Sequence, residues 1–330
     1  MREPWFWREE TIAARAVALG LSPFAALYDL GQQLRAHLSN PAPAPVPIIC
    51  VGNATLGGVG KTPFAIALCT LLKAEERNPV FLTRGYGGTA GAAPVKVDPA
   101  WHNANDVGDE ALLLARSAPV YVSKNRPDGA AAAAKDGADL IIMDDGYQNP
   151  TIEKTVSILL VNARRPSGSG AVFPAGPMRE PMARARARAD LIVYVGRDEN
   201  RAARAAEENG SPFAAWLEPA NPPEAHRVVA FCGIGDPQKF FYTLETAGFE
   251  IADRAAFPDH HAYTDQDIAV LEKRAASRNA PLITTEKDHV RLPARCAETT
   301  LTLPVAMRIN NPALLTGAVL SAIDRRNAQP

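Results

Sequence analysis

A glycine-rich turn between an apolar run and a helix-forming run most constrains the fold of this 330-residue chain. Residues 46–51 (VPIICV) predict a buried strand, residues 52–61 (GNATLGGVGK) a turn, and residues 62–73 (TPFAIALCTLLK) a helix. Backbone N–H groups in such a turn can surround a phosphate, and the helix N-terminus adds its dipole. The residues predicted to hold a nucleotide phosphate are Thr55, Gly57, Gly58, Val59, Gly60, Lys61 and Thr62, with Thr55 where the usual motif has its first glycine.

A second apolar run ends in paired carboxylates. Residues 140–143 (LIIM) predict a buried strand, and Asp144 and Asp145 follow it directly. Because the carboxyl ends of parallel strands lie along one edge of a sheet, we expect both carboxylates beside the phosphate turn, where they would hold Mg²⁺ with the hydroxyl of Thr62. The alternative is a pair of solvated aspartates that open a turn before Gly146.

Short apolar strands alternate with helix-forming segments along most of the chain. This order predicts an α/β fold of the P-loop NTPase type, with a mostly parallel sheet and helices on both faces. The proline-rich stretch 218–227 (EPANPPEAHR) is the best candidate for a domain boundary. We expect a helical arm at residues 1–40, a phosphate-loop domain at residues 41–222, and a smaller α/β domain at residues 223–330.

Composition and charge narrow the class of partner and compartment. The 35 basic and 36 acidic residues give a net charge of −1, which favours no nucleic-acid partner. Four widely spaced cysteines exclude a disulfide framework and a zinc ribbon and fit a reducing compartment. The first residues lack the pattern of a secretory signal. Residues 16–28 are uncharged but include Pro23, and they are fewer than the roughly 20 residues of a membrane span.

The first 40 residues predict two short helices, the second beginning at Ser22-Pro23. Tryptophans and leucines give this arm an apolar side, and arginines flank it. Such a side can be buried in lipid headgroups or packed against the rest of the protein, and the pattern alone leaves both interpretations open.

A set of motifs resembles the tetraacyldisaccharide 4′-kinase family, the lipid A 4′-kinases. The motifs are VGNATLGGVGKTP (51–63), RGYGG (84–88), VGDEALLLA (107–115), MDDGYQN (143–149), FPAGPMREP (173–181), FPDHHAYT (257–264) and TTEKD (284–288). The resemblance implies transfer of the ATP γ-phosphoryl group to the 4′-hydroxyl of a tetraacylated glucosamine disaccharide 1-phosphate. It also implies a peripheral enzyme on the cytoplasmic face of the bacterial inner membrane, and no obligate protein partner is indicated.

The same resemblance implies roles for individual residues. Asp109 would be the base that accepts the hydroxyl proton, assisted by a histidine of the DHH segment, with His260 favoured over His261. For Asp109 the alternative is a helix N-cap. Further implied roles are Mg²⁺ binding by Thr62, Asp144, Asp145 and Glu180, and phosphate binding by Lys61, Arg84, Arg126 and Arg179.

Two features of the chain leave details open. Asn149 stands where the family usually has a histidine, so no titratable role transfers to that position. Arg184, Arg186 and Arg188 form a basic patch that could meet the substrate 1-phosphate or anionic headgroups, or could be a solvated helix face. The competing functions are another small-molecule kinase with a phosphate loop, and a membrane-recruited ATPase switch.

Overall fold

A computed structural model describes residues 4–7, 9, 11–91, 93–165 and 170–328. The larger of its two sheets has nine strands in the order β13-β8-β7-β6-β1-β5-β2-β4-β3. The strands are β1 (Ile48–Asn53), β2 (Pro79–Thr83), β3 (Val95–Lys96), β4 (Val120–Val122), β5 (Leu140–Asp144), β6 (Val156–Asn162), β7 (Leu191–Gly196), β8 (Ala214–Pro219) and β13 (Val305–Ile309). All neighbours pair in parallel except β3 with β4 and β13 with β8. The predicted mostly parallel α/β fold is confirmed.

Helices cover both faces of this sheet because its central strands are apolar on both sides. Along β1, Ile49 and Val51 pack with α2 and α12, whereas Ile48 and Cys50 pack on the opposite face. We call this sheet and its helices the large unit. Its helices are α1 (Ile12–Leu38), α2 (Lys61–Ala74), α3 (Ala104–Val107), α4 (Asp109–Ala115), α5 (Arg126–Lys135), α6 (Met182–Ala187), α7 (Glu199–Glu208) and α12 (Pro312–Asn327), and the 3₁₀ turn η1 (Trp5–Trp7) precedes α1.

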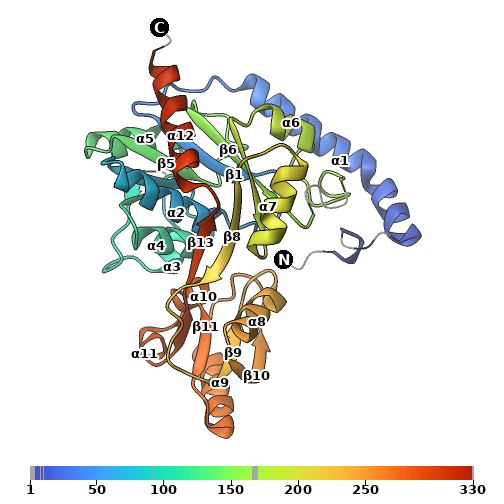
Figure 1. The fold of residues 1–330 in the computed structure, drawn as a ribbon, viewed down its shortest axis with the longest axis vertical. Helices are drawn as coiled ribbons and strands as arrows, with labels where there is room; N and C mark the ends of the chain where they lie inside the picture. The colour runs from blue at the N-terminus through green and yellow to red at the C-terminus, as the bar shows by residue number, and fades with distance from the viewer. Residues whose placement is uncertain (1–3, 8, 10, 92, 166–169, 329–330) are drawn as a thin grey trace.

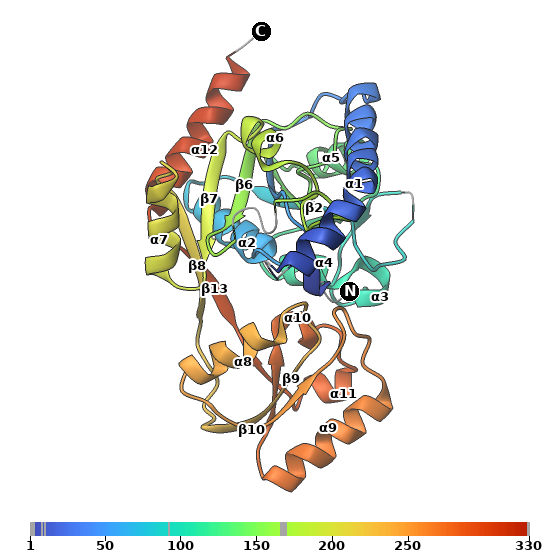
Figure 2. The same ribbon diagram turned by 90° about the vertical axis from the view of Figure 1, so that its right-hand side faces the viewer.

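A smaller parallel sheet, in the order β10-β9-β11-β12, forms the core of what we call the small unit. Its elements are β9 (Arg227–Cys232), α8 (Pro237–Thr246), β10 (Glu250–Ala256), α9 (Asp265–Arg278), β11 (Leu282–Thr285), α10 (Glu286–His289), α11 (Ala294–Ala297) and β12 (Leu301–Leu303). The two units are stacked along the long axis of the molecule (Figure 1), and the perpendicular view shows α10 at their junction (Figure 2).

The predicted extent of the third domain, residues 223–330, is wrong at its C-terminal end. The chain leaves the small unit after β12, and β13 pairs antiparallel with β8 at the edge of the large sheet. Helix α12 then packs against α2, with Leu315 and Val319 fully buried in the large core. An apolar helix face gains more from joining the existing core than from covering a small sheet that already has its own helices.

The expected break in the N-terminal arm is also wrong, because α1 is one continuous helix of 27 residues with Pro23 inside it. Proline removes the N–H that would bond to the carbonyl of Leu19. The Ser22 hydroxyl donates to that carbonyl at 2.7 Å, so the acceptor is still satisfied. Within the described chain, α1 is the single helix long and apolar enough to cross a membrane by length and composition.

The return of the chain to the large unit makes a testable prediction. Leu315 is 0% exposed and Leu314, its neighbour on α12, is 53% exposed. Leu315→Ala should lower the free energy of unfolding by about 2–5 kcal/mol, because it leaves a cavity in the core. Leu314→Ala is the matched control and should stay within about 0.5 kcal/mol of the unchanged protein in urea unfolding. Equal effects of the two substitutions would contradict this packing.

Candidate active site

The phosphate loop joins β1 to α2 and is hydrogen-bonded to a second segment of the chain. Gly57 and Gly60 adopt positive φ angles of 104° and 94°, which few other residues tolerate. The loop backbone is fastened by residues 177–179, since the Leu56 N–H donates to the carbonyl of Pro177 and the Arg179 N–H donates to that of Ala54, each at 2.7 Å. The conformation of the loop therefore depends on a segment more than a hundred residues away.

Lys61 and Thr62, the first residues of α2, each face a carboxylate. The Lys61 ammonium lies 3.6 Å from Asp145 Oδ1 and 3.3 Å from the amide oxygen of Asn53. The Thr62 hydroxyl donates to Asp144 Oδ2 at 2.9 Å. The expected convergence of phosphate loop and acidic pair is present because β1 and β5 are parallel neighbours, with Val51 beside Asp144.

The other oxygen of Asp144 is available to a cation. Asp144 Oδ1 is buried and has no hydrogen-bond partner among the residues that the structure describes. The pKa of Asp144 is raised from 3.8 to about 7, mainly by burial and next by the negative charge of Glu110. A buried carboxylate oxygen beside a threonine hydroxyl suits Mg²⁺, which takes one or two protein oxygens and completes its shell with phosphates and water. No cluster of three or more His, Cys, Asp or Glu side chains could hold a metal in the part of the chain that the structure describes.

Asp145 is instead paired within the protein. Arg179 binds it with both terminal nitrogens, at 2.8 and 3.2 Å. Although burial raises the pKa of Asp145, the charges of Lys61 and Arg179 outweigh it, and the pKa lies below its ordinary value. Glu180 accepts two hydrogen bonds from Arg188, at 2.6 and 2.7 Å, and one from Gln148 at 3.1 Å. Arg179 and Glu180 thus lie beside the acidic pair, but both are already engaged.

Two further arginines lie at the carboxyl ends of neighbouring strands. Arg84 follows β2 and is exposed, and Arg126 begins α5 after β4 and is 3% exposed. The Arg126 guanidinium donates to the Ser123 carbonyl, while its Nε has no hydrogen-bond partner in the described part of the chain. Burial, followed by the charge of Arg84, lowers the pKa of Arg126 to about 10. Two cations held near each other at this edge can bind an anion.

Glycines let the segment after β2 lie directly on the start of α4. A Cβ at Gly88 would come within 2.7–2.8 Å of backbone atoms of residues 106–108, and one at Gly108 would lie 2.5 Å from the Tyr86 carbonyl oxygen. Gly108 also has a φ of 87°. These close approaches set the position of Asp109, the first residue of α4, and explain why two glycine-rich segments accompany it.

Asp109 pairs with a histidine of the small unit. His260 Nδ1 lies 3.0 Å from Asp109 Oδ2, although 151 residues separate them in the chain. Asp109 is 4% exposed and its Oδ1 accepts the N–H of Glu110 at 2.9 Å, while Gly108 is the N-cap residue of α4. Burial raises the pKa of Asp109, but His260, Lys287 and Arg291 together hold it below its ordinary value. Asp109 is therefore an ionised carboxylate at the junction of the units.

His261 is not part of this pair. Its Nε2 lies 3.0 Å from Asp267 Oδ2, and its ring stacks on Phe257 at 4.8 Å. His260 is separated from it because its φ of 57° turns the backbone in the left-handed direction. His260, the histidine favoured as the one that assists Asp109, is thus the one that contacts it, and its assisting role stays a prediction.

Two neighbours of Asp109, Arg291 and Lys287, were missed by the sequence analysis. Arg291 Nε lies 3.4 Å and Lys287 Nζ lies 4.0 Å from Asp109 Oδ2, and Lys287 also lies 3.2 Å from Glu110 Oε1. The TTEKD motif contains Lys287. Arg291 lies four residues after Lys287, the spacing of neighbouring side chains on a helix. That motif was the signal by which the sequence could have pointed to these two residues. No feature of the neighbouring sequence indicates that it lies beside Asp109.

The basic patch of the sequence analysis is not a free surface. Arg184 binds Asp29 of α1 at 2.7 and 2.9 Å, Arg186 donates to the Tyr194 hydroxyl at 2.7 Å, and Arg188 binds Glu180. Asn149 accepts hydrogen bonds at 2.9 Å from both the N–H and the hydroxyl of Thr151, so at that position the amide stabilises a turn.

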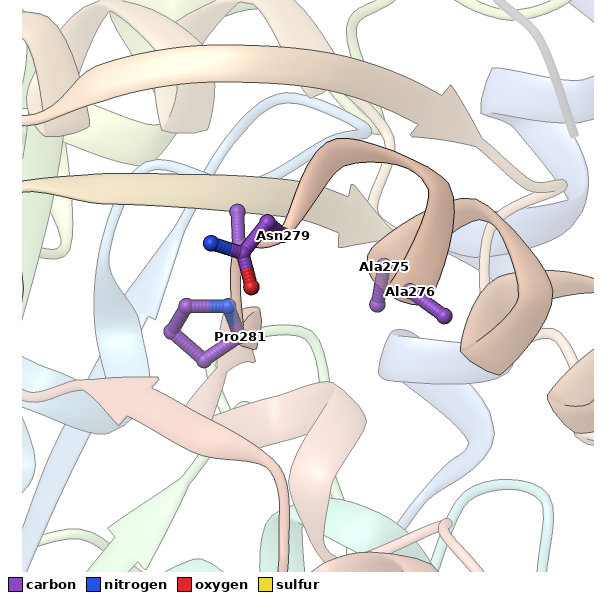
Figure 3. A pocket seen from close by; sticks show the side chains of 5 residues that line it. Ala275, Ala276, Asn279 and Pro281 are labelled. Atoms are coloured by element: carbon purple, nitrogen blue, oxygen red, sulfur yellow. The ribbon is translucent and has the colours of Figure 1, made fainter.

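A hollow in the small unit lies apart from these groups. It is lined by Ala275, Ala276, Asn279, Ala280 and Pro281, of which four are labelled in Figure 3. These residues precede β11, whereas Lys287 follows it, so the hollow and the junction lie at opposite ends of that strand. With one amide as its polar side chain, the hollow offers no group for nucleotide chemistry.

Comparison with known proteins shows the family of this chain. The model of the family described as tetraacyldisaccharide-1-P 4′-kinase matches residues 17–324. The chain belongs to this family. A tetraacyldisaccharide 4′-kinase of Methylobacterium nodulans is 46% identical over 98% of this chain and 96% of its own length. The corresponding protein of Methylobacterium sp. (strain 4-46) is 44% identical over the full length of both chains.

A solved structure extends the comparison to the fold. The LpxK structure from Aquifex aeolicus, described as an "apo" form in complex with ATP, is 25% identical to this chain. The two superpose with a TM-score of 0.74 over 93% of this chain and 99% of the other. The family relationship therefore holds for sequence and fold together.

The raised pKa of Asp144 predicts a pH-dependent stability difference. Below pH 3.8 the carboxyl is protonated in both the folded and the unfolded state, and between pH 3.8 and about 7 only the folded state retains the proton. In that range the Asp144 contribution to the free energy of unfolding should fall by about 1.4 kcal/mol per pH unit. Asp144→Asn should therefore gain stability relative to the unchanged protein as pH rises, measured by urea unfolding.

The exposed Asp324 provides the control for this measurement. Asp324→Asn makes the same substitution on the protein surface and is measured alongside it. A stability difference for Asp144→Asn that stays constant over this pH range would contradict the raised pKa of Asp144.

Proposed function

We propose that this protein is an ATP-dependent kinase that phosphorylates the 4′-hydroxyl of a tetraacylated glucosamine disaccharide 1-phosphate in lipid A biosynthesis. The observation that carries the proposal is the ionised, buried Asp109 paired with His260 at 3.0 Å, on the edge of the sheet that bears the phosphate loop. Family membership, relatives of that name at 44–46% identity, and the ATP complex of the related structure from Aquifex aeolicus support it.

The phosphate loop would bind the triphosphate of ATP. Lys61 is oriented for the β- and γ-phosphates by Asn53 and Asp145, and backbone N–H groups from Thr55 to Gly60 would surround the chain of phosphates. Thr62 and Asp144 would hold Mg²⁺, with Asp145 and Glu180 next to them. When bound, Mg²⁺ offsets the negative charge of the β- and γ-phosphates.

Asp109 would act on the acceptor hydroxyl. The 4′-oxygen forms a bond to the γ-phosphorus as the bond from that phosphorus to the bridging oxygen of ADP breaks, and the hydroxyl proton passes to the Asp109 carboxylate. His260 orients that carboxylate through its Nδ1. Arg84 and Arg126 provide positive charge for the transferred group. Glu110 contributes to the raised pKa of Asp144, so the Asp109 segment lies within electrostatic reach of the phosphate loop.

Helix α1 would bring the acylated substrate to this site by lying on the cytoplasmic face of the inner membrane. Its outward side carries exposed leucines, including Leu27 at 68% and Leu34 at 55% exposure. The helix is also fastened to the large unit, because Asp29 binds Arg184 and the Trp7 indole donates to the Pro174 carbonyl at 3.1 Å. Figure 2 shows α1 along the outside of the large unit.

Transfer of labelled phosphate tests the proposal directly. Incubation with labelled ATP and the disaccharide acceptor should move the label to the lipid in thin-layer separation. Label released only as free phosphate would contradict the kinase and favour a membrane-recruited ATPase switch. Transfer to a different small acceptor would favour another kinase with the same loop.

Loss of the base should affect turnover more than nucleotide binding. Asp109→Ala should lower kcat by about 10²–10⁴-fold, the contribution of a positioned general base, with little change in the Kd for ATP. Asp324→Ala on the exposed side of α12 serves as the control and should retain full activity. Parallel losses in kcat and ATP affinity for Asp109→Ala would indicate a structural role instead.

The membrane role of α1 should depend on its exposed leucines. The double variant Leu27→Glu with Leu34→Glu should reduce partition into anionic liposomes by at least about tenfold, because each leucine loses apolar burial. The control variant, Val270→Glu with Leu314→Glu, adds the same charge at similarly exposed apolar positions elsewhere. If both variants partition alike in a flotation assay, α1 is not the membrane contact.

A further inference from the structure

Lys287 occupies a position between the units that no role above explains. It lies on α10 at the carboxyl end of β11, and its side chain is 26% exposed. Its Nζ lies 3.3 Å from His260 Nε2 and 3.2 Å from Glu110 Oε1. The same nitrogen is 4.0 Å from Asp109 Oδ2. One ammonium therefore contacts both members of the Asp109–His260 pair and the residue next to Asp109.

The direction of these hydrogen bonds determines which ring nitrogen of His260 carries the proton. A lysine ammonium has three donors and no acceptor, so the ring nitrogen that faces it accepts and carries no proton. The proton of the neutral imidazole is then on Nδ1, which donates to Asp109 Oδ2. We propose that Lys287 is a positioning residue, an inference that rests on the proposed function. It holds His260 as the Nδ1–H tautomer and keeps Asp109 an ionised proton acceptor.

The other groups around the pair either oppose or assist this role. The Asp259 carboxylate lies 3.9 Å from His260 Nε2 and favours a proton there, but it is beyond hydrogen-bond distance, whereas Lys287 is within it. Arg291 assists, since its Nε lies 3.4 Å from Asp109 Oδ2. The Tyr86 ring packs edge-on against the imidazole, at 5.6 Å between ring centroids. Lys287 is thus the contact that opposes a proton on Nε2, while Asp109 favours one on Nδ1.

Removal of the ammonium has defined consequences. In Lys287→Met, Asp259 and Asp109 would flank His260 from both sides, and a proton on Nε2 would no longer face a cation. Lys287 is among the groups that lower the pKa of Asp109, so that pKa would rise. Glu110 would also lose its partner from the small unit. Lys287→Arg should restore the wild-type state, because a guanidinium also only donates.

The first measurement is independent of catalysis. Full-length protein labelled with ¹⁵N-histidine is compared by NMR at pH 7.5 as wild type, Lys287→Met, Lys287→Arg and Lys273→Met, with Lys273 as an exposed control on α9. The His260 signals are assigned by their loss in His260→Gln. We expect Nδ1–H with unprotonated Nε2 in all except Lys287→Met, where the ring proton moves from Nδ1 to Nε2. An unchanged tautomer in Lys287→Met would overturn the proposal.

The second measurement is the pH profile of phosphate transfer. Lys287→Met should lower kcat by roughly tenfold, the effect of one lost charge-assisted hydrogen bond, with little change in the KM for ATP. The acidic limb of the profile should move to higher pH, and Lys287→Arg should return both values toward wild type. A fall in kcat with an unmoved acidic limb would assign Lys287 a merely structural role and overturn the proposal. Absence of transfer by the wild type would instead contradict the proposed function, while the NMR result still decides the tautomer.

Discussion

One buried negative charge joins the two units of this protein. Asp109 is 4% exposed, and a carboxylate in such a site is costly unless cations and hydrogen bonds compensate it. Among the described residues, the large unit supplies the backbone N–H of Glu110, whereas the small unit supplies His260, Lys287 and Arg291. The docking of the small unit is therefore what keeps Asp109 ionised. The same contact brings a group suited to accept a proton to the edge where the phosphate loop begins.

The small unit is itself organised to present these cations. Asp288 is fully buried and accepts hydrogen bonds from the Gly233 N–H at 2.8 Å and the Tyr263 hydroxyl at 2.7 Å. It also pairs with Arg291 at 3.1 Å. This network fixes the turn after β11, so the lysine and arginine on either side of Asp288 project toward the large unit together. Figure 1 shows α10 at that junction.

A second set of contacts connects the N-terminal arm with the phosphate loop. Trp7 and Tyr28 pack edge-on against Phe173, at 6.1 and 5.4 Å between ring centroids. Phe173 begins the segment whose later residues fasten the phosphate loop through Pro177 and Arg179. Arm, segment and loop thus form one continuous set of packed and hydrogen-bonded groups. A membrane-bound arm would therefore be held in a constant relation to the nucleotide site.

Local sequence determined the parts that neighbouring residues build together: the strand, glycine turn and helix of the phosphate loop, the acidic end of β5, and the alternation that makes a parallel sheet. Strand periodicity and turn chemistry act within a few residues, so they can be read from the chain alone. Tertiary structure decided which side chains meet across the junction. It selected His260 over His261, added Lys287 and Arg291, engaged Arg184, Arg186 and Arg188 in internal contacts, and returned α12 to the large core. The contacts across the junction depend on how the two units pack and where a buried charge finds its cations, and they join residues more than a hundred positions apart.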